Sequence, residues 1–420
     1  MRLITKPREK QLYTLFGVLF FVGMMAVGYY YNLTFVQLGL IDLGERILGL
    51  SRTRVAVDMA LLAVLTALTA ISVGWWSNRR GWGQNLILRF RLAFGVVLSQ
   101  TVLTFAAARI SSEAGFLAWL VICSLTLGVG VPVTFSMTVD LVPRRWRGTT
   151  AALITSVAYL AANVIPASWR VEDLAAPLYW IMPAGALGLA GLAFIRWPFW
   201  THYTQRHLDP AFARGRYSIS ETNRLGISPR LLGFILLMFA VFFVDSLGFL
   251  RMLETPLFML TAWQSPSAGV RITIGVVHVI GALVAGVLYD VLNVRALFYW
   301  IFGIFSLVHL MYSFSLRFSG ESLPLTMPIL YALAVSIYTV VNFALWADTA
   351  TPRTSGLNTA LGVAFSGWFA TFLSTALAVY WESQGLALDR HLNIVDAISM
   401  LAFVALILLA FRPKKEGHPR

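Results

Sequence analysis

The sequence predicts an all-α membrane protein from its composition, its long apolar segments and the placement of its basic residues. Of its 420 residues, 58% are hydrophobic and 12% are charged, whereas a soluble domain has about 45–50% apolar and about 25% charged residues. A helix needs about 20 apolar residues to cross a bilayer. Because backbone groups in lipid must be paired within their own segment, each such stretch is predicted as a helix. Twelve stretches qualify: 12–36, 54–77, 86–108, 115–140, 149–168, 175–197, 230–260, 269–289, 295–315, 325–347, 355–381 and 393–411.

The basic residues predict the orientation of these spans. The net charge of +13 comes from 32 Lys and Arg against 19 Asp and Glu. When the connections are grouped alternately, 23 of the 32 lie on the side that carries both termini, which leaves 9 for the opposite connections and the spans. Since cytoplasmic connections carry the excess of Lys and Arg, we expect a multi-pass inner-membrane protein with both termini cytoplasmic. The charge therefore indicates topology, and no nucleic-acid partner is expected.

The segments between the spans agree with this order. The basic start Met1–Gln11 leads into the first span without a small-residue cleavage site, so it is interpreted as part of a retained helix. The longest polar connection, 200–229, contains Arg206, Asp209, Arg214, Arg216 and Arg224 and is predicted to be a solvated basic linker, which at most binds anionic lipid headgroups. We expect six-helix bundles at 1–199 and 230–420 on either side of it.

A first motif recurs at the ends of the fourth and tenth spans. In each copy an Asp ends the span, a Pro and an Arg occupy the short connection, and a Gly follows eight residues after the Asp. The copies are Asp140, Pro143, Arg144 and Gly148, and Asp348, Pro352, Arg353 and Gly356.

A second motif follows the second and eighth spans. Its first copy contains Gly74, Ser77, Asn78, Arg79 and Gly81, and its second contains Gly286, Leu288 and Asp290. The copies of the two motifs are separated by 208 to 212 positions (356 − 148 and 286 − 74). An internal repeat of this kind is typical of transporters built from two related halves.

With these motifs, the twelve predicted spans and the central basic linker, the chain resembles the major facilitator superfamily in layout over its whole length. The signature loop of that family is Gly-x-Leu-Ala/Ser-Asp-Arg/Lys-x-Gly-Arg/Lys; this chain shares Gly74, Ser77, Arg79 and Gly81 with it but has Asn78 in place of the Asp. The resemblance implies a secondary transporter whose cytoplasmic charge network latches an outward-open state. Asn78 weakens that network in the first half, because an amide cannot form an ion pair.

The chemistry of the motif residues is consistent with a latch. Glycine lets neighbouring helices approach closely. Asp140 and Asp348 could pair with Arg144, Arg147 or Arg353, or with Arg79 across the halves. The alternative is that these charges only set the topology and form solvated ion pairs, each contributing about 0–1 kcal/mol.

Polar residues inside the spans are the candidates for solute or proton binding, because ionisable groups are costly in lipid. Asp245 is the first candidate, about 15 residues or roughly 22 Å into the seventh span. The alternative is an Asp that packs between helices, held by an Arg or by backbone groups. Its repeat partner is Asn32, which follows three tyrosines. The further candidates are His278 and Asn342, for which a hydrogen bond to a neighbouring helix is the alternative, and Tyr31 and Tyr338, which could line a cavity.

Arg251 and Glu254 lie three residues apart and could form an ion pair near the outer interface.

Other features define what the chain is not expected to do. The sequence has no GxxxxGK[ST] loop, no Cys/His cluster with metal-ligand spacing and no catalytic constellation, and Cys123 is its single cysteine. We therefore expect no enzyme activity, no metal and no cofactor.

The leading hypothesis is a secondary transporter that moves a small solute by alternating access, with proton coupling through Asp245. The alternative is a non-transporting protein of the same fold that acts as an assembly factor or accessory subunit of a larger membrane complex. The expected partners are the solute, protons and the lipid bilayer, and we expect a monomer unless the chain belongs to such a complex. The identity of the solute and the direction of transport are not encoded in any motif.

Overall fold

The computed structural model describes residues 7–165, 168–217, 228–253, 258, 261–263, 265–292, 294–318, 324–351 and 353–410. All regular elements within these ranges are helices, as the composition predicts. The helices before residue 198 are α1 (Pro7–Tyr30), η1 (Tyr31–Val36), α2 (Gln37–Asp42), η2 (Leu43–Ile47), α3 (Arg52–Arg80), η3 (Trp82–Gln84), α4 (Leu86–Ala107), α5 (Glu113–Ser136), α6 (Thr138–Leu141), η4 (Arg144–Trp146), α7 (Arg147–Val164), α8 (Val171–Ala175) and α9 (Leu178–Phe194).

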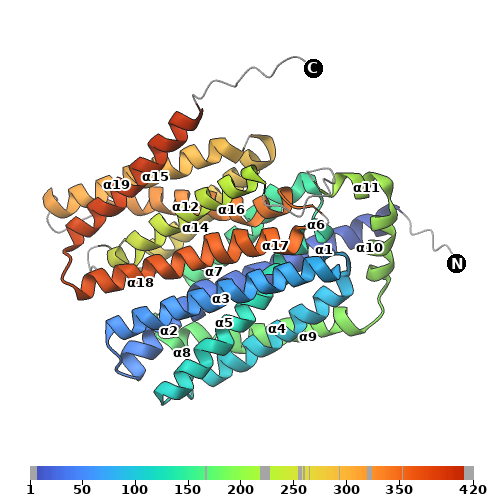
Figure 1. Ribbon diagram of the computed structural model, residues 1–420, viewed down its shortest axis with the longest axis horizontal. Coiled ribbons are helices and arrows are strands. Elements are labelled where there is room, and N and C mark those ends of the chain that lie inside the picture. Colours follow the sequence, from blue (N-terminus) through green and yellow to red (C-terminus); the bar gives the residue numbers. More distant parts are fainter. Residues whose placement is uncertain are drawn as a thin grey trace.

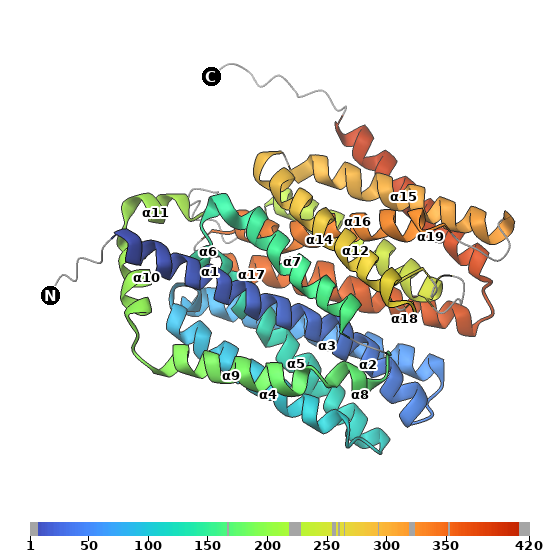
Figure 2. The same ribbon diagram turned by 180° about the vertical axis from the view of Figure 1, so that it is seen from behind.

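Two short helices and a second series of long helices follow. They are α10 (Pro198–Leu208), α11 (Pro210–Gly215), α12 (Pro229–Leu253), α14 (Ala268–Val291), α15 (Val294–Phe318), α16 (Thr326–Asp348), α17 (Ser355–Thr359), η5 (Ala360–Phe369), α18 (Ala370–Ser383) and α19 (Leu388–Ala410). Figures 1 and 2 show the long helices as one bundle, with α15, α16 and α19 on one side and α4, α5 and α9 on the other.

Local sequence signals set the helix ends. Ser51, Asn85 and Ser112 are N-caps whose side chains accept hydrogen bonds from backbone N–H groups of the first turn of α3, α4 and α5. Gly81 ends α3 with φ +68°, a left-handed conformation that glycine adopts without a Cβ penalty. The second-motif glycine at this position is thus explained by the turn.

Eleven helical stretches in the described residues are long and apolar enough to cross a membrane, one fewer than the sequence predicted. The predicted span 149–168 forms α7, but this helix includes Arg147, Thr155 and Asn163 and is not among the eleven. Most of its residues are buried, and it packs against α14, α1 and α16. A helix surrounded by protein does not need an apolar surface on every side, which explains its lower hydropathy.

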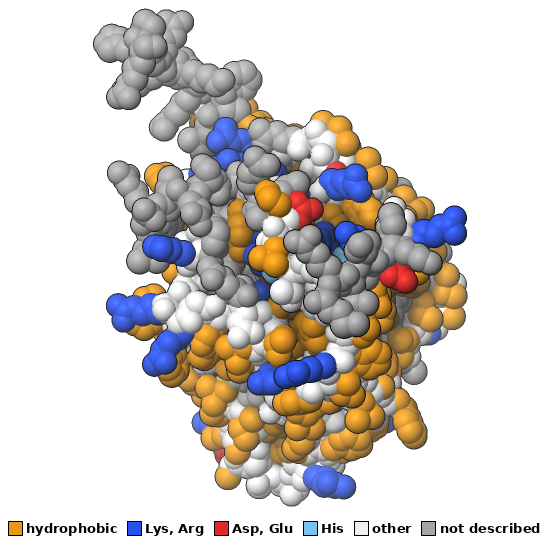
Figure 3. All heavy atoms as spheres, turned by 90° about the vertical axis from the view of Figure 1, so that its right-hand side faces the viewer, with side chains coloured by type: hydrophobic (Ala, Val, Ile, Leu, Met, Phe, Trp, Pro, Cys, Tyr) orange, Lys and Arg blue, Asp and Glu red, His pale blue; other side chains and the backbone are white. Residues whose placement is uncertain are grey.

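The two ends of the bundle differ. We call the end at which α10 and α11 lie the linker end, and the end at which α3 begins and α18 finishes the far end (Figure 1). Viewed directly, the described part of the linker end has basic side chains and a few acidic ones distributed over an otherwise apolar and neutral surface (Figure 3). The far end carries ion pairs of its own, among them the one between Arg54 and Asp58.

The connection predicted as a solvated loop at 200–229 is in part a packed structure. Phe199, His202 and Tyr203 of α10 are buried, and the Tyr203 side chain fills the space beside Gly17 of α1. Thr14 of α1 lies 3.2 Å from His202 Nε2. The prediction of a purely solvated linker is therefore wrong for α10, because its aromatic face packs against α1; residues 218–227 lie outside the described residues.

Candidate functional site

A cavity lies between α1, α7, α12, α14, α16 and α18. It encloses about 1000 Å³, including the part open to solvent, and it is lined by 24 residues, of which 11 are aromatic. Asp245 is the one charged side chain among these lining residues. Because an ionised carboxylate is costly to bury among apolar aromatic side chains, it needs hydrogen-bonding or charged partners.

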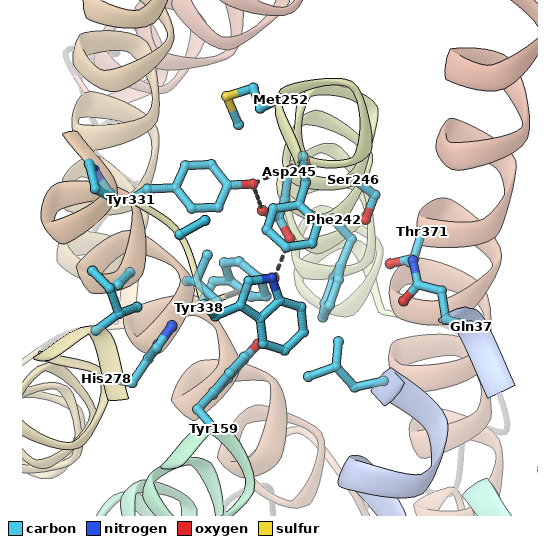
Figure 4. Close-up of a pocket in the computed structure, with 18 of the residues that line it drawn as sticks. Gln37, Tyr159, Phe242, Asp245, Ser246, Met252, His278, Tyr331, Tyr338 and Thr371 are labelled. Atoms are coloured by element: carbon cyan, nitrogen blue, oxygen red, sulfur yellow. Dashed lines mark hydrogen bonds between the residues drawn. The ribbon is translucent and has the colours of Figure 1, made fainter. Parts of the chain in front are cut away.

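Two phenols hold Asp245 from the same helix. Tyr331 OH donates to Asp245 Oδ1, and Tyr338 OH donates to Oδ2 at 2.5 Å. The two tyrosines are seven residues apart in α16, which places them two turns apart on one face. Figure 4 shows both rings directed at the carboxylate. No ion pair of Asp245 with a described residue accompanies these hydrogen bonds.

A second polar set links α1 and α7 with α14 and α16. Tyr29 OH lies 3.0 Å from Tyr159 OH, which in turn lies 3.2 Å from Thr339 Oγ1. The His278 ring stacks on Tyr159 with 4.3 Å between ring centroids and an interplanar angle of 6°. Its Nδ1 lies 2.9 Å from Ser336 Oγ. The cavity wall is therefore joined by hydrogen bonds between segments more than a hundred residues apart.

The structure brings four of the six predicted inner residues to this cavity. Asn32, Asp245, His278 and Tyr338 line it. Tyr31 does not, because its ring is fully buried beside Phe35 and its hydroxyl lies 3.8 Å from Cys123 Sγ. Asn342 does not line it either, because its Oδ1 accepts a hydrogen bond from Trp346 Nε1.

Sequence reasoning missed two tyrosines that shape the site, Tyr159 and Tyr331. The seven-residue spacing between Tyr331 and Tyr338 was the signal available for one of them. No comparable spacing connects Tyr159 to Asp245, so that proximity follows from helix packing alone.

At the linker end, the motif glycines cross in two pairs. A Cβ on Gly148 of α7 would lie 2.4 Å from the Gly286 carbonyl oxygen of α14. A Cβ on Gly74 of α3 would lie 2.7 Å from the Gly356 carbonyl oxygen of α17. We call these the α7–α14 crossing and the α3–α17 crossing. Each joins a glycine of one motif to a glycine of the other, and any side chain there would force the backbones apart.

The residue beside each crossing differs. Asp290 accepts hydrogen bonds from the backbone N–H groups of Gly148 and Thr149, at 2.9 and 3.1 Å, and from Thr149 Oγ1. It thus caps the N-terminal end of α7, where a carboxylate also complements the helix dipole. Asn78, the repeat equivalent of Asp290 (78 + 212), has its Oδ1 3.2 Å from the position of a Cβ on Gly356.

One motif aspartate, Asp140, pairs with other residues than the sequence suggested, whereas Asp348 pairs with the suggested Arg147. Asp140 contacts Arg89 of α4 and Arg216, and His207 Nε2 lies 3.0 Å from its Oδ1. Within the described ranges, no ion pair of Asp140 with Arg144, Arg147, Arg353 or Arg79 is found, so those suggested pairs are wrong. Burial lowers the pKa of the Arg216 guanidinium, and burial with nearby Arg89 and Arg206 lowers the pKa of His207 to about 4. The linker thus supplies part of a buried charge cluster.

Asp348 forms the ion pair that joins distant parts of the chain. Arg147 Nη1 lies 2.6 Å from Asp348 Oδ1, and Tyr289 OH donates to Oδ2 at 2.7 Å. Arg147 Nη2 also donates to the Arg216 carbonyl oxygen at 2.6 Å. One arginine therefore connects α7, α16 and the linker.

The remaining motif arginines are at the surface. The Arg79 guanidinium lies 4.2 Å from the centroid of the Trp75 ring, and Arg144 and Arg353 are exposed. These exposed arginines are better suited to contact a membrane–water interface than to form a buried latch.

At the far end, Arg251 pairs with Glu382, which the sequence did not single out. Arg251 Nη1 lies 2.9 Å from Glu382 Oε1, and Arg52 Nη1 of α3 lies 2.6 Å from the same oxygen. The predicted partner Glu254 lies outside the described residues. Among those residues, no group of three or more His, Cys, Asp or Glu is placed to hold a metal ion.

Comparisons with known proteins agree with this architecture. Residues 2–166 match the model of the Major Facilitator Superfamily. The human organic anion transporter MFSD10 (TETRAN) shares the fold at 16% identity and a TM-score of 0.57, over 96% of this chain and 100% of that one. A bacterial homologue of the iron transporter ferroportin, in an outward-facing state, shares it at 13% identity and a TM-score of 0.62, over 96% and 99%. No curated protein matches the chain.

At these identities the solved structures show a common fold and carry no information on the solute. They extend, however, over the part of the chain that the family model leaves unmatched. The resemblance is thereby supported: the family model matches residues 2–166, and the solved structures share the fold over 96% of the chain.

Proposed function

We propose that this membrane transporter moves a small solute by alternating access, with the cavity around Asp245 as the binding site. The observation that carries the proposal is the aromatic cavity with one carboxylate, located between helices from both parts of the chain. Such an intermediate position is where transporters of this architecture bind their substrates. The six-helix units 1–199 and 230–420 would rock about it, with the linker end facing the cytoplasm.

The contacts at the two ends support a gate on each side. The two glycine crossings and the Arg147–Asp348 pair connect the parts of the chain at the linker end. The Arg52–Glu382 pair connects them at the far end. Opening of either end would require separation of these contacts, and a solute in the cavity would be accessible from one side at a time.

Proton coupling through Asp245 is the finer part of the proposal. Its carboxylate has hydrogen-bond donors but no cationic partner among the described residues. A charge so placed is stabilised by binding either a proton or a cation. The other titratable side chains that line the same cavity are Tyr29, Tyr159, His278, Tyr312, Tyr331 and Tyr338.

The test uses the full chain in proteoliposomes that contain a pH-sensitive dye. A solute library is added outside, and the expected result is movement of protons driven by particular solutes. Asp245→Asn should abolish this proton movement, because an amide cannot exchange a proton at neutral pH. Proton movement that persists unchanged in Asp245→Asn contradicts the coupling role.

Asp396→Asn is the matched control. Asp396 of α19 has the same exposed fraction as Asp245, 9%, but does not line the cavity. This variant should move protons like the unmodified protein. A chain that responds to no solute, and copurifies with a stable partner, would instead be the assembly factor or accessory subunit.

A further inference from the structure

The charge of the cavity selects among solutes. Its 24 lining residues include one carboxylate and no Lys or Arg. An anionic solute would approach Asp245 without a compensating cation, at a considerable cost in an apolar chamber. A metal ion would need several close oxygen, nitrogen or sulfur ligands, and the described residues offer no such group.

The aromatic rings favour the same sign of charge. Phe242 and Tyr338 meet nearly edge to face beside Asp245, with ring centroids 4.8 Å apart at 67°. Tyr159 and Tyr331 complete the wall around the carboxylate (Figure 4). Aromatic faces attract cations through their quadrupole, and cages of such rings are a known way to bind organic ammonium groups.

Neutral polar groups occupy the other side of the chamber. Gln37 and Thr371 lie across the cavity from Tyr331 (Figure 4). Amide and hydroxyl groups can form hydrogen bonds with a solute but do not offset a charge. The cavity is therefore polarised in charge: its one carboxylate is held by Tyr331 and Tyr338, and neutral hydrogen-bonding groups lie across from Tyr331.

We propose that the solute is an organic monocation with an apolar body, whose charge lies between Asp245 and the surrounding aromatic rings. This inference rests on the proposed transport function and specifies its substrate class. The solute cation and the proton would then compete for one carboxylate, so that each would leave the site as the other enters.

The test compares three probes of similar size on the purified full chain in detergent: phenyltrimethylammonium, its neutral isostere tert-butylbenzene, and the anion benzenesulfonate. Binding is followed by intrinsic tryptophan fluorescence, to which Trp263 and Trp368 of the cavity wall contribute, and by thermal unfolding. We expect the cation to bind at least tenfold more tightly than the neutral isostere, a difference of about 1.4 kcal/mol, and the anion to bind most weakly.

Two variants separate the carboxylate from the rings. Asp245→Asn should remove the preference for the cation while the neutral isostere still binds, because the rings remain. Phe242→Leu should weaken binding of the cation several-fold more than binding of the isostere. Asp396→Asn should leave all three affinities unchanged.

Three outcomes would overturn the inference: equal or tighter binding of the neutral or anionic probe, no binding of the cation at millimolar concentration, or an unchanged preference in Asp245→Asn. Its failure can be told apart from failure of the transport proposal. If an anionic or neutral solute drives proton movement in proteoliposomes, transport stands and the cationic class is wrong; if no solute does, and no solute enters the proteoliposomes either, the transport proposal itself falls.

Discussion

The α7–α14 and α3–α17 crossings use the same glycine contact but differ in the residue that secures it. At the α7–α14 crossing, Asp290 accepts three hydrogen bonds from the start of α7. At the α3–α17 crossing, Asn78 provides a neutral amide. The difference suggests that the first crossing is held by charge and the second mainly by packing. We therefore expect them to respond differently to substitution, although their backbones approach similarly.

Two reporters can follow the crossings separately. The side chain of Ala152 faces Gly286, and that of Ala360 faces Gly74; both are buried. Ala152→Cys and Ala360→Cys would each place a thiol at one crossing, over a low background because Cys123 is buried and is the chain's single cysteine. The rate of thiol labelling from the linker end then measures how often each crossing opens.

The largest effect is expected for Gly148→Leu. Its Cβ would meet the Gly286 backbone at 2.4 Å and Asp290 Oδ1 at 2.6 Å, so the helices must separate. We expect transport to be lost and the free energy of unfolding to fall by about 3 kcal/mol, the upper part of the usual overpacking range. Thermal unfolding and solute-driven proton movement measure the two effects.

Gly95→Leu is the control, because no atom lies within 4 Å of a Cβ at that glycine. It should retain transport. Gly148→Ala gives a milder test if the leucine variant does not fold, since its Cβ alone already makes the short contacts. Normal transport by Gly148→Ala would show that the α7–α14 crossing need not be close.

A smaller effect is expected for Arg147→Gln. The change removes the ion pair with Asp348 and weakens the hydrogen bond to the Arg216 carbonyl. Because Asp348 remains partly exposed and keeps its hydrogen bond from Tyr289, we expect the free energy of unfolding to fall by about 2 kcal/mol. Labelling of the Ala152→Cys reporter should accelerate; unchanged labelling would mean that this pair does not hold the gate.

Asp290→Asn should make the charged crossing resemble the neutral one. The amide oxygen can still accept from α7, but the favourable interaction of a charge with the helix dipole is lost, at about 0.5–1 kcal/mol. Labelling of Ala152→Cys should rise several-fold while that of Ala360→Cys changes less. Equal acceleration at both reporters would show that the two crossings open as one.

Asn78→Asp is the reverse change, and its expected effect is the smallest. It restores the residue type of the family's signature loop next to the start of α17. The added charge should stabilise the closed state by about 0.3–1 kcal/mol. This should slow labelling of Ala360→Cys by a factor of about two to five. Faster labelling would mean that the added charge is repelled or poorly placed.

Much of this organisation could be predicted from the motif residues. The recurrence of Asp and Gly at fixed spacing identified all four crossing glycines and Asp290, because close helix contacts and helix caps depend on residue type. The partners of Asp140 could not be predicted in this way. Arg89 and Arg216 are far from it in the chain and reach it only through the packing of α4 and the linker.

The inner residues show the same limit on a smaller scale. Asn32 lines the cavity and the adjacent Tyr31 does not, although both follow the same run of tyrosines. Successive helical residues point about 100° apart, and the π-helical turns at Tyr31–Val36 alter the register here. Sequence patterns could nominate the polar residues but could not tell which of them line the cavity.

The sequence by itself determined the helical membrane architecture, the repeat and the close glycine contacts, because these depend on hydropathy, spacing and the absence of a side chain. The tertiary structure alone decided which charges meet and what surrounds Asp245. The carboxylate lies among Tyr331, Tyr338 and rings from other helices, and these meet only when segments distant in the chain pack together. The same acid could otherwise have been a packing residue, and its aromatic surroundings make it a candidate for binding a cation.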